Sequence, residues 1–142
     1  MDLRAYMQPP VVNETKTVYP SKRLRVADGK PAPFVIRVID QETNNKLIKQ
    51  ATEKKKANGR LVETLNSEKY GNLLIQACVV EPDLKNAELC SYYKTMNPVD
   101  TINRMLSVGE YNRLVREIKL LNEIDELADD EDAEIVEEEL KN

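Results

Sequence analysis

The sequence predicts an α+β fold, with a small N-terminal antiparallel β-sheet packed against a mainly α-helical C-terminal half. Two observations lead to this prediction. Extended, β-branched segments lie on both sides of a turn-forming Asp28-Gly29 pair in the first 40 residues. After residue 66, apolar residues recur at helical spacing, and capping residues and prolines separate the helical stretches. A chain of 142 residues is long enough for one domain with a modest core.

The N-terminal sheet is predicted to be built on a hairpin. Residues 1–14 precede it as an arm or short helix, which ends at Pro9-Pro10. Residues 15–26 are extended, and residues 34–39 form a β-branched run, F-V-I-R-V-I. We expect these two segments to pair across the Asp28-Gly29 turn.

A helix and a possible third strand are predicted next. Asp40 is placed to cap a helix that begins near Gln41 and continues to the lysines at 54–56, where Gly59 stops it. Residues 60–65, R-L-V-E-T-L, alternate in polarity and are a possible third strand beside the hairpin.

The C-terminal half is predicted to begin with two helices joined by a corner. Asn66-Ser67 caps the first helix, which ends near Val80 because Pro82 cannot continue it. The acidic corner Glu81-Pro82-Asp83 follows, and we interpret it as a turn rather than as a catalytic site. A shorter helix is expected over residues 87–94.

Two further helix starts carry clear capping signals. Asn97-Pro98 supplies a cap and a proline at the first helical position, with Asp100 in the first turn. Ser107 and Glu110 have the spacing of a capping box, so a fresh helix is predicted to begin there and to continue to Leu121.

Charge is distributed unevenly along the chain. Residues 1–70 hold 14 basic and 8 acidic side chains, whereas residues 123–142 hold 11 acidic side chains and one lysine. Acidic runs with few apolar residues are typical of disordered tails. We therefore expect one α+β domain over residues 1–122 and an acidic, disordered tail over residues 123–142.

No pattern in the sequence indicates catalysis. The chain has no histidine, which removes the commonest general base and metal ligand. Its four glycines are far apart, and Cys78 and Cys90 have neither metal-ligand nor redox spacing. The sequence predicts a protein that is not an enzyme, with no catalytic, cofactor-binding or metal-binding residues.

The lysine-rich stretch from 46 to 60 offers a weaker alternative. Helical spacing places Lys46, Lys49 and Lys56 near one face, which suits phosphate contacts. No aromatic residue lies among them, and the chain is acidic overall. A solvated helix face is the simpler interpretation, so nucleic acid is not the expected partner.

Sequence also gives an expectation about location. No apolar run approaches the length of about 20 residues that spans a bilayer. The first residues lack the apolar core of a secretory signal. We expect a cytoplasmic protein with no membrane partner.

Several stretches, in a fixed order, resemble a known family. They are V-Y-P-S-K-R-L, P-F-V-I-R-V-I, the long run L-N-S-E-K-Y-G-N-L-L-I-Q-A-C-V-V-E-P-D-L-K-N-A-E-L, and M-L-S-V-G-E-Y-N-R-L. This order resembles the XkdN-like tail assembly chaperones of PBSX-type, contractile-tailed phages and prophages of Gram-positive bacteria. The likeness covers about residues 3–125, and V-V-E-P-D-L-K is its most specific element.

The resemblance implies a non-enzymatic chaperone in the cytoplasm of the bacterial host. Such proteins bind the tape measure protein and help to recruit tail tube subunits around it. Many of their genes also yield a longer, frameshifted product, so that form is a further partner to consider, as is a second copy of the chain. Two alternatives are kept: a structural tail or baseplate component retained in the particle, and a small nucleic-acid-binding regulator that uses the 46–60 lysines.

Partner contacts are expected where aromatic and methionine side chains gather in the second half. Such side chains adapt to irregular apolar partners, although each also suits the protein's own core. The predicted partner-binding residues are Tyr92, Tyr93, Met96, Met105, Val108, Tyr111 and Leu114.

Overall fold

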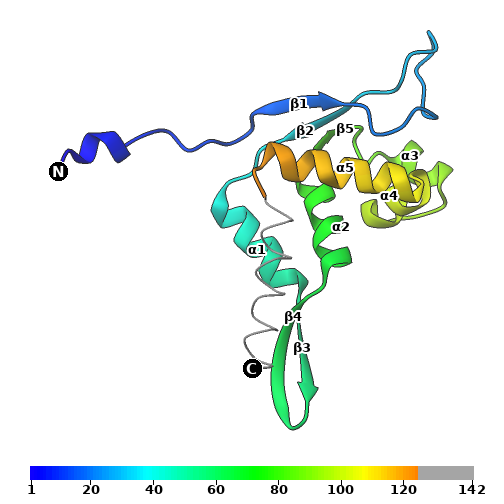
Figure 1. Ribbon diagram of the computed structural model, residues 1–142. Coiled ribbons are helices and arrows are strands. Elements are labelled where there is room, and N and C mark those ends of the chain that lie inside the picture. Colours follow the sequence, from blue (N-terminus) through cyan, green and yellow to red (C-terminus); the bar gives the residue numbers. More distant parts are fainter. Residues whose placement is uncertain (125–142) are drawn as a thin grey trace.

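The computed structural model describes residues 1–124 as a set of helices packed against a small sheet, with an arm and a hairpin projecting from them (Figure 1). In chain order the elements are the 3-10 helix η1 (Leu3–Tyr6), strands β1 (Thr15–Val18) and β2 (Phe34–Arg37), helix α1 (Gln41–Ala51), strands β3 (Thr52–Ala57) and β4 (Arg60–Leu65), helix α2 (Ser67–Cys78), strand β5 (Val79–Glu81), and helices α3 (Ala87–Tyr92), α4 (Pro98–Met105) and α5 (Val108–Leu121). The predicted α+β class is confirmed.

The predicted N-terminal hairpin is confirmed, with both strands shorter than predicted. β1 pairs antiparallel with β2, and Val18 lies opposite Phe34. β2 begins at Phe34, as predicted, because the prolines before it cannot donate to a ladder. Residues 19–33 form a long loop in which Gly29, with φ of 87°, supplies the left-handed turn.

The third strand of this sheet is not the predicted one. The sheet order is β1-β2-β5, so β5 occupies the position expected for residues 60–65. The sequence predicts a helix that ends near Val80, but α2 ends at Cys78 and the chain continues as a strand against β2. β-Branched residues suit this pairing, which Pro82 then ends.

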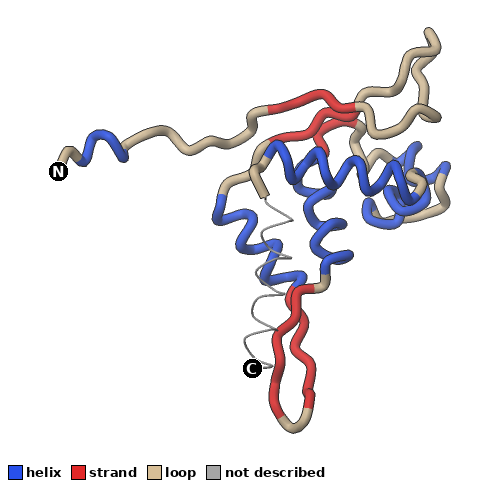
Figure 2. Tube along the Cα trace, in the orientation of Figure 1, coloured by secondary structure: helices blue, strands red, loops and turns tan. Residues whose placement is uncertain are grey.

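Residues 52–65 form a separate two-stranded hairpin, so the prediction of a helix running to the lysines at 54–56 was wrong. α1 ends at Ala51, and β3 pairs only with β4 (Figure 2). Asn58 and Gly59 have φ values of 53° and 77°, the left-handed conformation that a tight hairpin turn requires. Consequently Lys56 does not share a helix face with Lys46 and Lys49.

The helices start where capping residues predict. Asp40, Asn66, Asn97 and Ser107 each accept a hydrogen bond from a backbone N–H of the first turn. At α5 the capping box is complete, because Glu110 in return accepts from the Ser107 N–H at 2.8 Å.

One core joins the sheet to the helices. α5 packs on β1, β2 and α2, and α1 lies along α2. The largest fully buried apolar side chains come from β2, α2, α4 and α5, and they are Phe34, Ile36, Leu74, Ile75, Ile102, Leu114 and Ile118. The N-terminal arm, which includes η1, has no buried residue and extends away from this core (Figure 1).

The predicted boundary between domain and tail falls at the end of the described chain. α5 ends at Leu121, and Asn122 caps it. Glu123 and Ile124 belong to the turn that closes α5, where the Ile124 N–H donates to the Lys119 carbonyl oxygen at 2.8 Å. The rest of the predicted acidic tail, residues 125–142, lies outside the described residues.

Candidate functional site

The acidic corner after β5 is held by its own polar side chains. The Glu81-Pro82 peptide bond is cis. Asp83 Oδ1 accepts from the Lys85 N–H at 3.0 Å, and the Asp83 carbonyl oxygen accepts from the Asn86 N–H at 3.1 Å. Asn86 then caps α3 through the Leu89 N–H at 3.1 Å. These bonds use the polar groups of the corner for turn formation, as the sequence predicted.

Two hollows lie on either side of this corner, and Asp83 lines both. One, of about 440 Å³, is lined by Pro82, Asp83, Asn86, Glu88, Leu89 and Tyr92. The other, of about 380 Å³, is lined by Gln76, Val79, Val80, Asp83, Leu84, Lys85 and Pro98. We define the corner surface as the exposed or partly exposed residues Val80, Glu81, Pro82, Asp83, Glu88, Leu89 and Tyr92.

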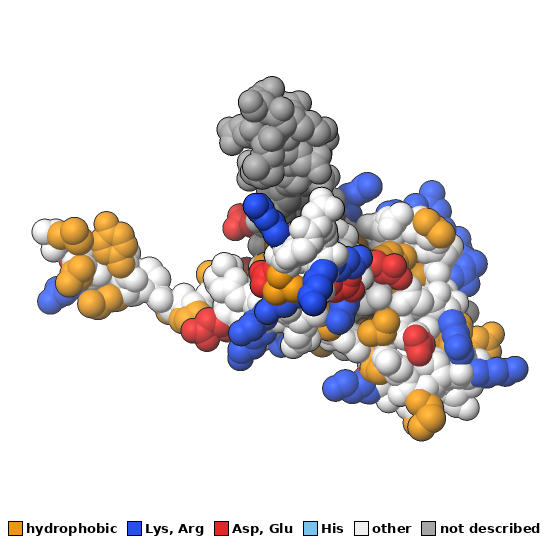
Figure 3. Space-filling view, turned by 90° about the horizontal axis from the view of Figure 1, so that it is seen from below, with side chains coloured by type: hydrophobic (Ala, Val, Ile, Leu, Met, Phe, Trp, Pro, Cys, Tyr) orange, Lys and Arg blue, Asp and Glu red, His pale blue; other side chains and the backbone are white. Residues whose placement is uncertain are grey.

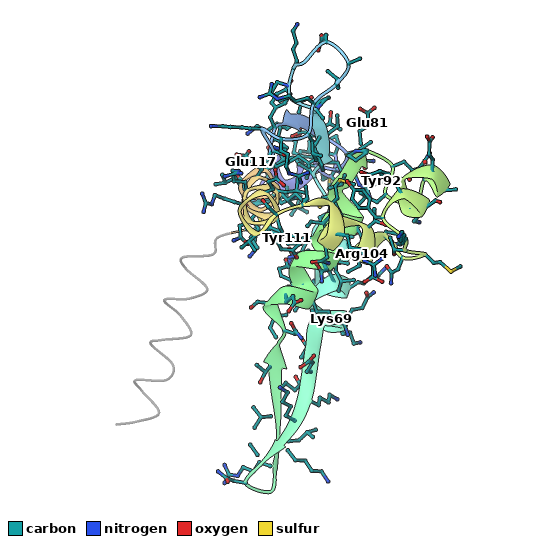
Figure 4. All side chains as sticks on the ribbon, turned by 90° about the vertical axis from the view of Figure 1, so that its right-hand side faces the viewer. Lys69, Glu81, Tyr92, Arg104, Tyr111 and Glu117 are labelled. Atoms are coloured by element: carbon teal, nitrogen blue, oxygen red, sulfur yellow. The ribbon has the colours of Figure 1, made fainter. Side chains whose placement is uncertain are left out.

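Tyr92 is the largest apolar side chain of the corner surface. Its exposed fraction is 77%, and it stands on α3 on the same side of the molecule as Glu81 (Figure 4). Its ring meets the Tyr93 ring edge to face, with centroids 4.8 Å apart. An exposed aromatic ring beside an apolar hollow is typical of an anchor for a partner.

The frame behind Tyr92 is fixed by α4. Arg104 Nη1 donates to the carbonyl oxygens of Tyr93 and Lys94, at 2.7 and 2.6 Å, which satisfies the C-terminal end of α3. The Cys90 thiol donates to the Leu84 carbonyl oxygen at 3.3 Å, and Leu84 itself is buried. The corner surface is therefore presented on a supported element rather than on a free loop.

The corner surface is negatively charged. It carries the carboxylates of Glu81, Asp83 and Glu88, and Lys85 lines the second hollow nearby. Among residues 1–124, none of these three carboxylates takes part in a salt bridge. The apolar floor of the first hollow and the acidic residues around it together suit a partner segment that carries apolar side chains flanked by Lys or Arg.

The structure places the seven predicted contact residues in three different environments. Tyr92, Met96 and Val108 are exposed, by 77%, 100% and 81%. Tyr93 and Tyr111 are partly buried against the core. Met105 and Leu114 are buried in the core, so the described chain does not present these two to a partner.

Tyr111 has a structural role. Its hydroxyl donates to Asn72 Oδ1 at 2.7 Å and lies close above Gly71, where an added Cβ would meet the hydroxyl oxygen at 2.9 Å. The absence of a side chain at Gly71 thus permits the close approach of α2 and α5. Tyr111 therefore joins two helices.

Sequence reasoning did not single out Val80, Pro82 and Leu89 as contact residues. They lie on one surface because β5 forms an edge of the sheet and the corner then turns the chain into α3, so that Pro82 and Leu89 line one hollow. The one available signal was the β-branched pair Val79-Val80 directly before a proline, which fits a strand end as well as a helix end.

A second cluster of polar side chains joins two of the stretches on which the family resemblance rests, V-Y-P-S-K-R-L and the G-E-Y of M-L-S-V-G-E-Y-N-R-L. The buried carboxylate of Glu110 accepts hydrogen bonds from the hydroxyl of Ser21 and from Arg23 Nη2, the latter at 2.8 Å. Arg113 Nε also donates to the Pro20 carbonyl oxygen at 2.9 Å. These bonds fasten the loop after β1 to the start of α5, so the cluster is structural.

Cys78 offers no activated thiol. Burial raises the pKa of the Cys78 thiol to about 11, against the smaller opposing influences of Arg37 and Asn122. A thiol with such a pKa stays protonated at neutral pH and is a poor nucleophile. Within residues 1–124, no three His, Cys, Asp or Glu side chains gather in a way that holds a metal ion.

The chain matches a known protein family over almost its whole length. Residues 3–140 match the model of the phage XkdN-like tail assembly chaperone proteins. The chain belongs to this family. The resemblance inferred from the order of its motifs is thereby confirmed.

Relatives from Bacillus subtilis strain 168 agree with this assignment. The chain is 32% identical to the phage-like element PBSX protein XkdN, over 99% of this chain and 94% of XkdN. It is 34% identical to the protein YqbN, over 93% of this chain and 91% of YqbN. A crystal structure of YqbN superposes with a TM-score of 0.66 at 26% identity, and covers 88% of this chain and 97% of that structure. As for membranes, none of the helices within residues 1–124 has the length and apolarity to cross one.

Proposed function

We propose that this family member binds the tape measure protein and assists assembly of the tail tube around it, without catalysing a reaction. Membership of the tail assembly chaperone family supports a role in tail assembly. The observation that carries the proposed contact is the corner surface, where an exposed Tyr92 borders an apolar hollow with an acidic rim.

The corner surface suits a helical partner. A tape measure protein is expected to be a long, largely helical polymer with apolar stripes, and such stripes dock into apolar grooves through side chains spaced three and four residues apart. The hollow of about 440 Å³ has room for a few apolar side chains of one such stripe. Glu81, Asp83 and Glu88 are placed to attract basic residues beside the stripe.

A function that depends on binding and not on catalysis also agrees with the chemistry of the described residues. The Cys78 thiol is buried with a raised pKa, and the carboxylate of Glu110 is used in hydrogen bonds within the fold. We place the activity in the cytoplasm of the bacterial host, where the tail is assembled. A tail tube protein, a longer frameshifted form and a second copy are further candidate partners.

Co-expression tests the proposal. The chain and the tape measure protein of the same phage or prophage are expected to purify as a soluble complex. Tyr92→Asp is expected to abolish this complex, because it places a charge at the proposed anchor. Tyr6→Asp is the matched control, since Tyr6 is exposed by 75% but lies on the N-terminal arm. A tape measure protein that is equally soluble with and without the chain would overturn the proposal.

Particle composition separates this role from that of a retained tail component. An assembly chaperone is expected to be absent from purified particles, and mass spectrometry of those particles measures this directly. Stoichiometric presence of the chain in the particle would instead favour a structural role.

A further inference from the structure

The β3–β4 hairpin (residues 52–65), here called the hairpin arm, lacks a partner within the described chain. Every residue of β4 is exposed, and in β3 only Thr52 and Glu53 are partly buried. Figure 1 shows the arm projecting from the ends of α1 and α2. Two-stranded hairpins are marginally stable alone in water, so such an arm is expected to be covered by something.

One face of the hairpin arm combines leucines with lysines. Lys54 pairs with Glu63 and Lys56 pairs with Leu61, while Leu65 lies opposite Thr52. Directly paired residues project from the same side of a ladder, so these side chains share one face, here called the leucine face. Leu61 and Leu65 are exposed by 61% and 42%.

The opposite face is similar in charge but different in apolar content. It carries Lys55, Val62 and Arg60, since Lys55 pairs with Val62 and Ala57 with Arg60. Seen along the arm from its tip, blue Lys and Arg side chains cluster around it (Figure 3). The arm as a whole holds four basic and two acidic residues.

The described chain ends beside the start of α1, where Asn122 Oδ1 accepts from the Ile39 N–H at 2.8 Å, and one hollow extends from there to the base of the leucine face. This hollow, of about 310 Å³, is lined by the turn before α1, by α1, the arm and α2, and by the turn after α5. Its residues are Ile39, Asp40, Gln41, Asn44, Ile48, Leu65, Tyr70, Asn122, Glu123 and Ile124. Leu65 and Ile124 therefore face one hollow. In the sequence, residues 125–142 follow Ile124 directly.

Those 18 residues complement the arm in charge and in apolar content. They contain ten acidic side chains and one lysine, and their apolar residues are Leu127, Ala128, Ala133, Ile135, Val136 and Leu140. Even in its most compact regular form, a helix, a chain of 18 residues spans about 27 Å. From Ile124 the segment has to pass α1, whose 11 residues span about 16 Å, and then the six residues of a strand, which span about 20 Å. An extended chain of 18 residues spans about 60 Å, so the segment reaches the tip of the arm when part of it is extended.

We propose that residues 125–142 bind the leucine face of the hairpin arm within the same chain. Their carboxylates neutralise Lys54 and Lys56, and their apolar side chains cover Leu61 and Leu65. An acidic partner segment then reaches the arm only by displacing residues 125–142. This assignment is independent of the corner surface and of the proposed partner.

Zero-length carbodiimide cross-linking of the full chain tests the contact directly. At low salt, we expect amide cross-links from Lys54 and Lys56 to acidic residues within 125–142. Their yield should fall about tenfold in 1 M NaCl, where the Debye length is only about 3 Å. Lys16 and Glu117, whose charged atoms lie 3.2 Å apart, form the internal positive control.

Mixing isotope-labelled and unlabelled chains distinguishes contacts within one chain from contacts between chains. Cross-links within one chain support the proposal. Cross-links only between chains overturn it, and so does their absence when the Lys16–Glu117 cross-link forms.

Hydrogen exchange of matched variants provides the second test. Lys54→Gln with Lys56→Gln should at least halve the protection of amides 60–65, because it removes the cations of the leucine face. Lys55→Gln with Arg60→Gln is the control, since it makes the same charge change on the other face. Each double variant also breaks one ion pair. The first breaks Lys54–Glu63 and the second breaks Lys55–Glu53, and both pairs have the same N–O distance of 3.8 Å. Equal effects of the two variants would overturn the proposal.

Discussion

At the scale of single residues, Glu110 links the loop after β1 to the start of α5. Burial of its carboxyl would raise the pKa, but hydrogen bonds from the Ser107 backbone N–H, Ser21 and Arg23 outweigh burial and hold the pKa at about 2. The pKa is lower in the folded than in the unfolded chain. This contribution to stability is therefore complete above the ordinary value of 4.5 and is lost as pH falls toward 2.

Glu110→Gln is expected to lower the free energy of unfolding at pH 7 by about 2 kcal/mol, because the charged acceptor of a buried cluster is lost. Urea unfolding at pH 7, 4.5 and 3 measures this. The wild-type protein should lose more stability between pH 4.5 and 3 than the variant does. Parallel losses in the two proteins would contradict the assigned pKa.

Replacement of Lys94 by glycine is expected to increase the stability of the protein. It follows the C-terminal cap of α3 with φ of 55°, and the Thr95 N–H donates to the Cys90 carbonyl oxygen at 3.0 Å, as in a Schellman motif. Because a side chain strains this left-handed position, Lys94→Gly should raise the unfolding free energy by about 0.5–1 kcal/mol. Lys94→Ala is the control and should show no gain in thermal or urea unfolding.

At the scale of secondary-structure elements, the contact of α2 with α5 depends on Gly71. Gly71→Ala is expected to destabilise the fold by about 1–3 kcal/mol, because the new methyl group meets the Tyr111 hydroxyl. Tyr111→Phe removes that hydroxyl at a cost of about 1 kcal/mol from the lost bond to Asn72. The double variant should be more stable than the sum of the two losses predicts. A double-mutant cycle with additive losses would show that the hydroxyl is not the obstacle.

Helix starts were predictable from sequence, whereas strand partners were not. Asp40, Asn66, Asn97 and Ser107 act locally, within the first turn that each one caps, so their roles could be inferred from the chain alone. The pairing of β5 with β2 joins residues more than 40 positions apart, and no local pattern specifies it. The hairpin arm had a local signal, Asn58-Gly59, but its lysine run was also compatible with a helix.

At the scale of the whole molecule, the family was predictable and the contact surface only partly so. The order of motifs predicted the family, which the match over residues 3–140 confirms. Those motifs also contain caps and clusters that fix the helices, such as Glu110 with Ser21. Aromatic and methionine content pointed to Tyr92, but it could not separate this exposed residue from the buried Met105. Exposure depends on how α3 and α4 pack on the body, which composition does not specify.

The affinity of a Tyr92→Ala variant for the tape measure protein tests the central claim most directly. Isothermal titration with a soluble helical segment of that protein should give a dissociation constant about tenfold higher than for the wild-type chain, since aromatic anchors contribute about 1.4 kcal/mol or more. Tyr6→Ala, which removes an equally exposed ring from the arm, should leave the affinity unchanged. An unchanged affinity for Tyr92→Ala, with the fold intact, would contradict the assignment of the corner surface as the binding site.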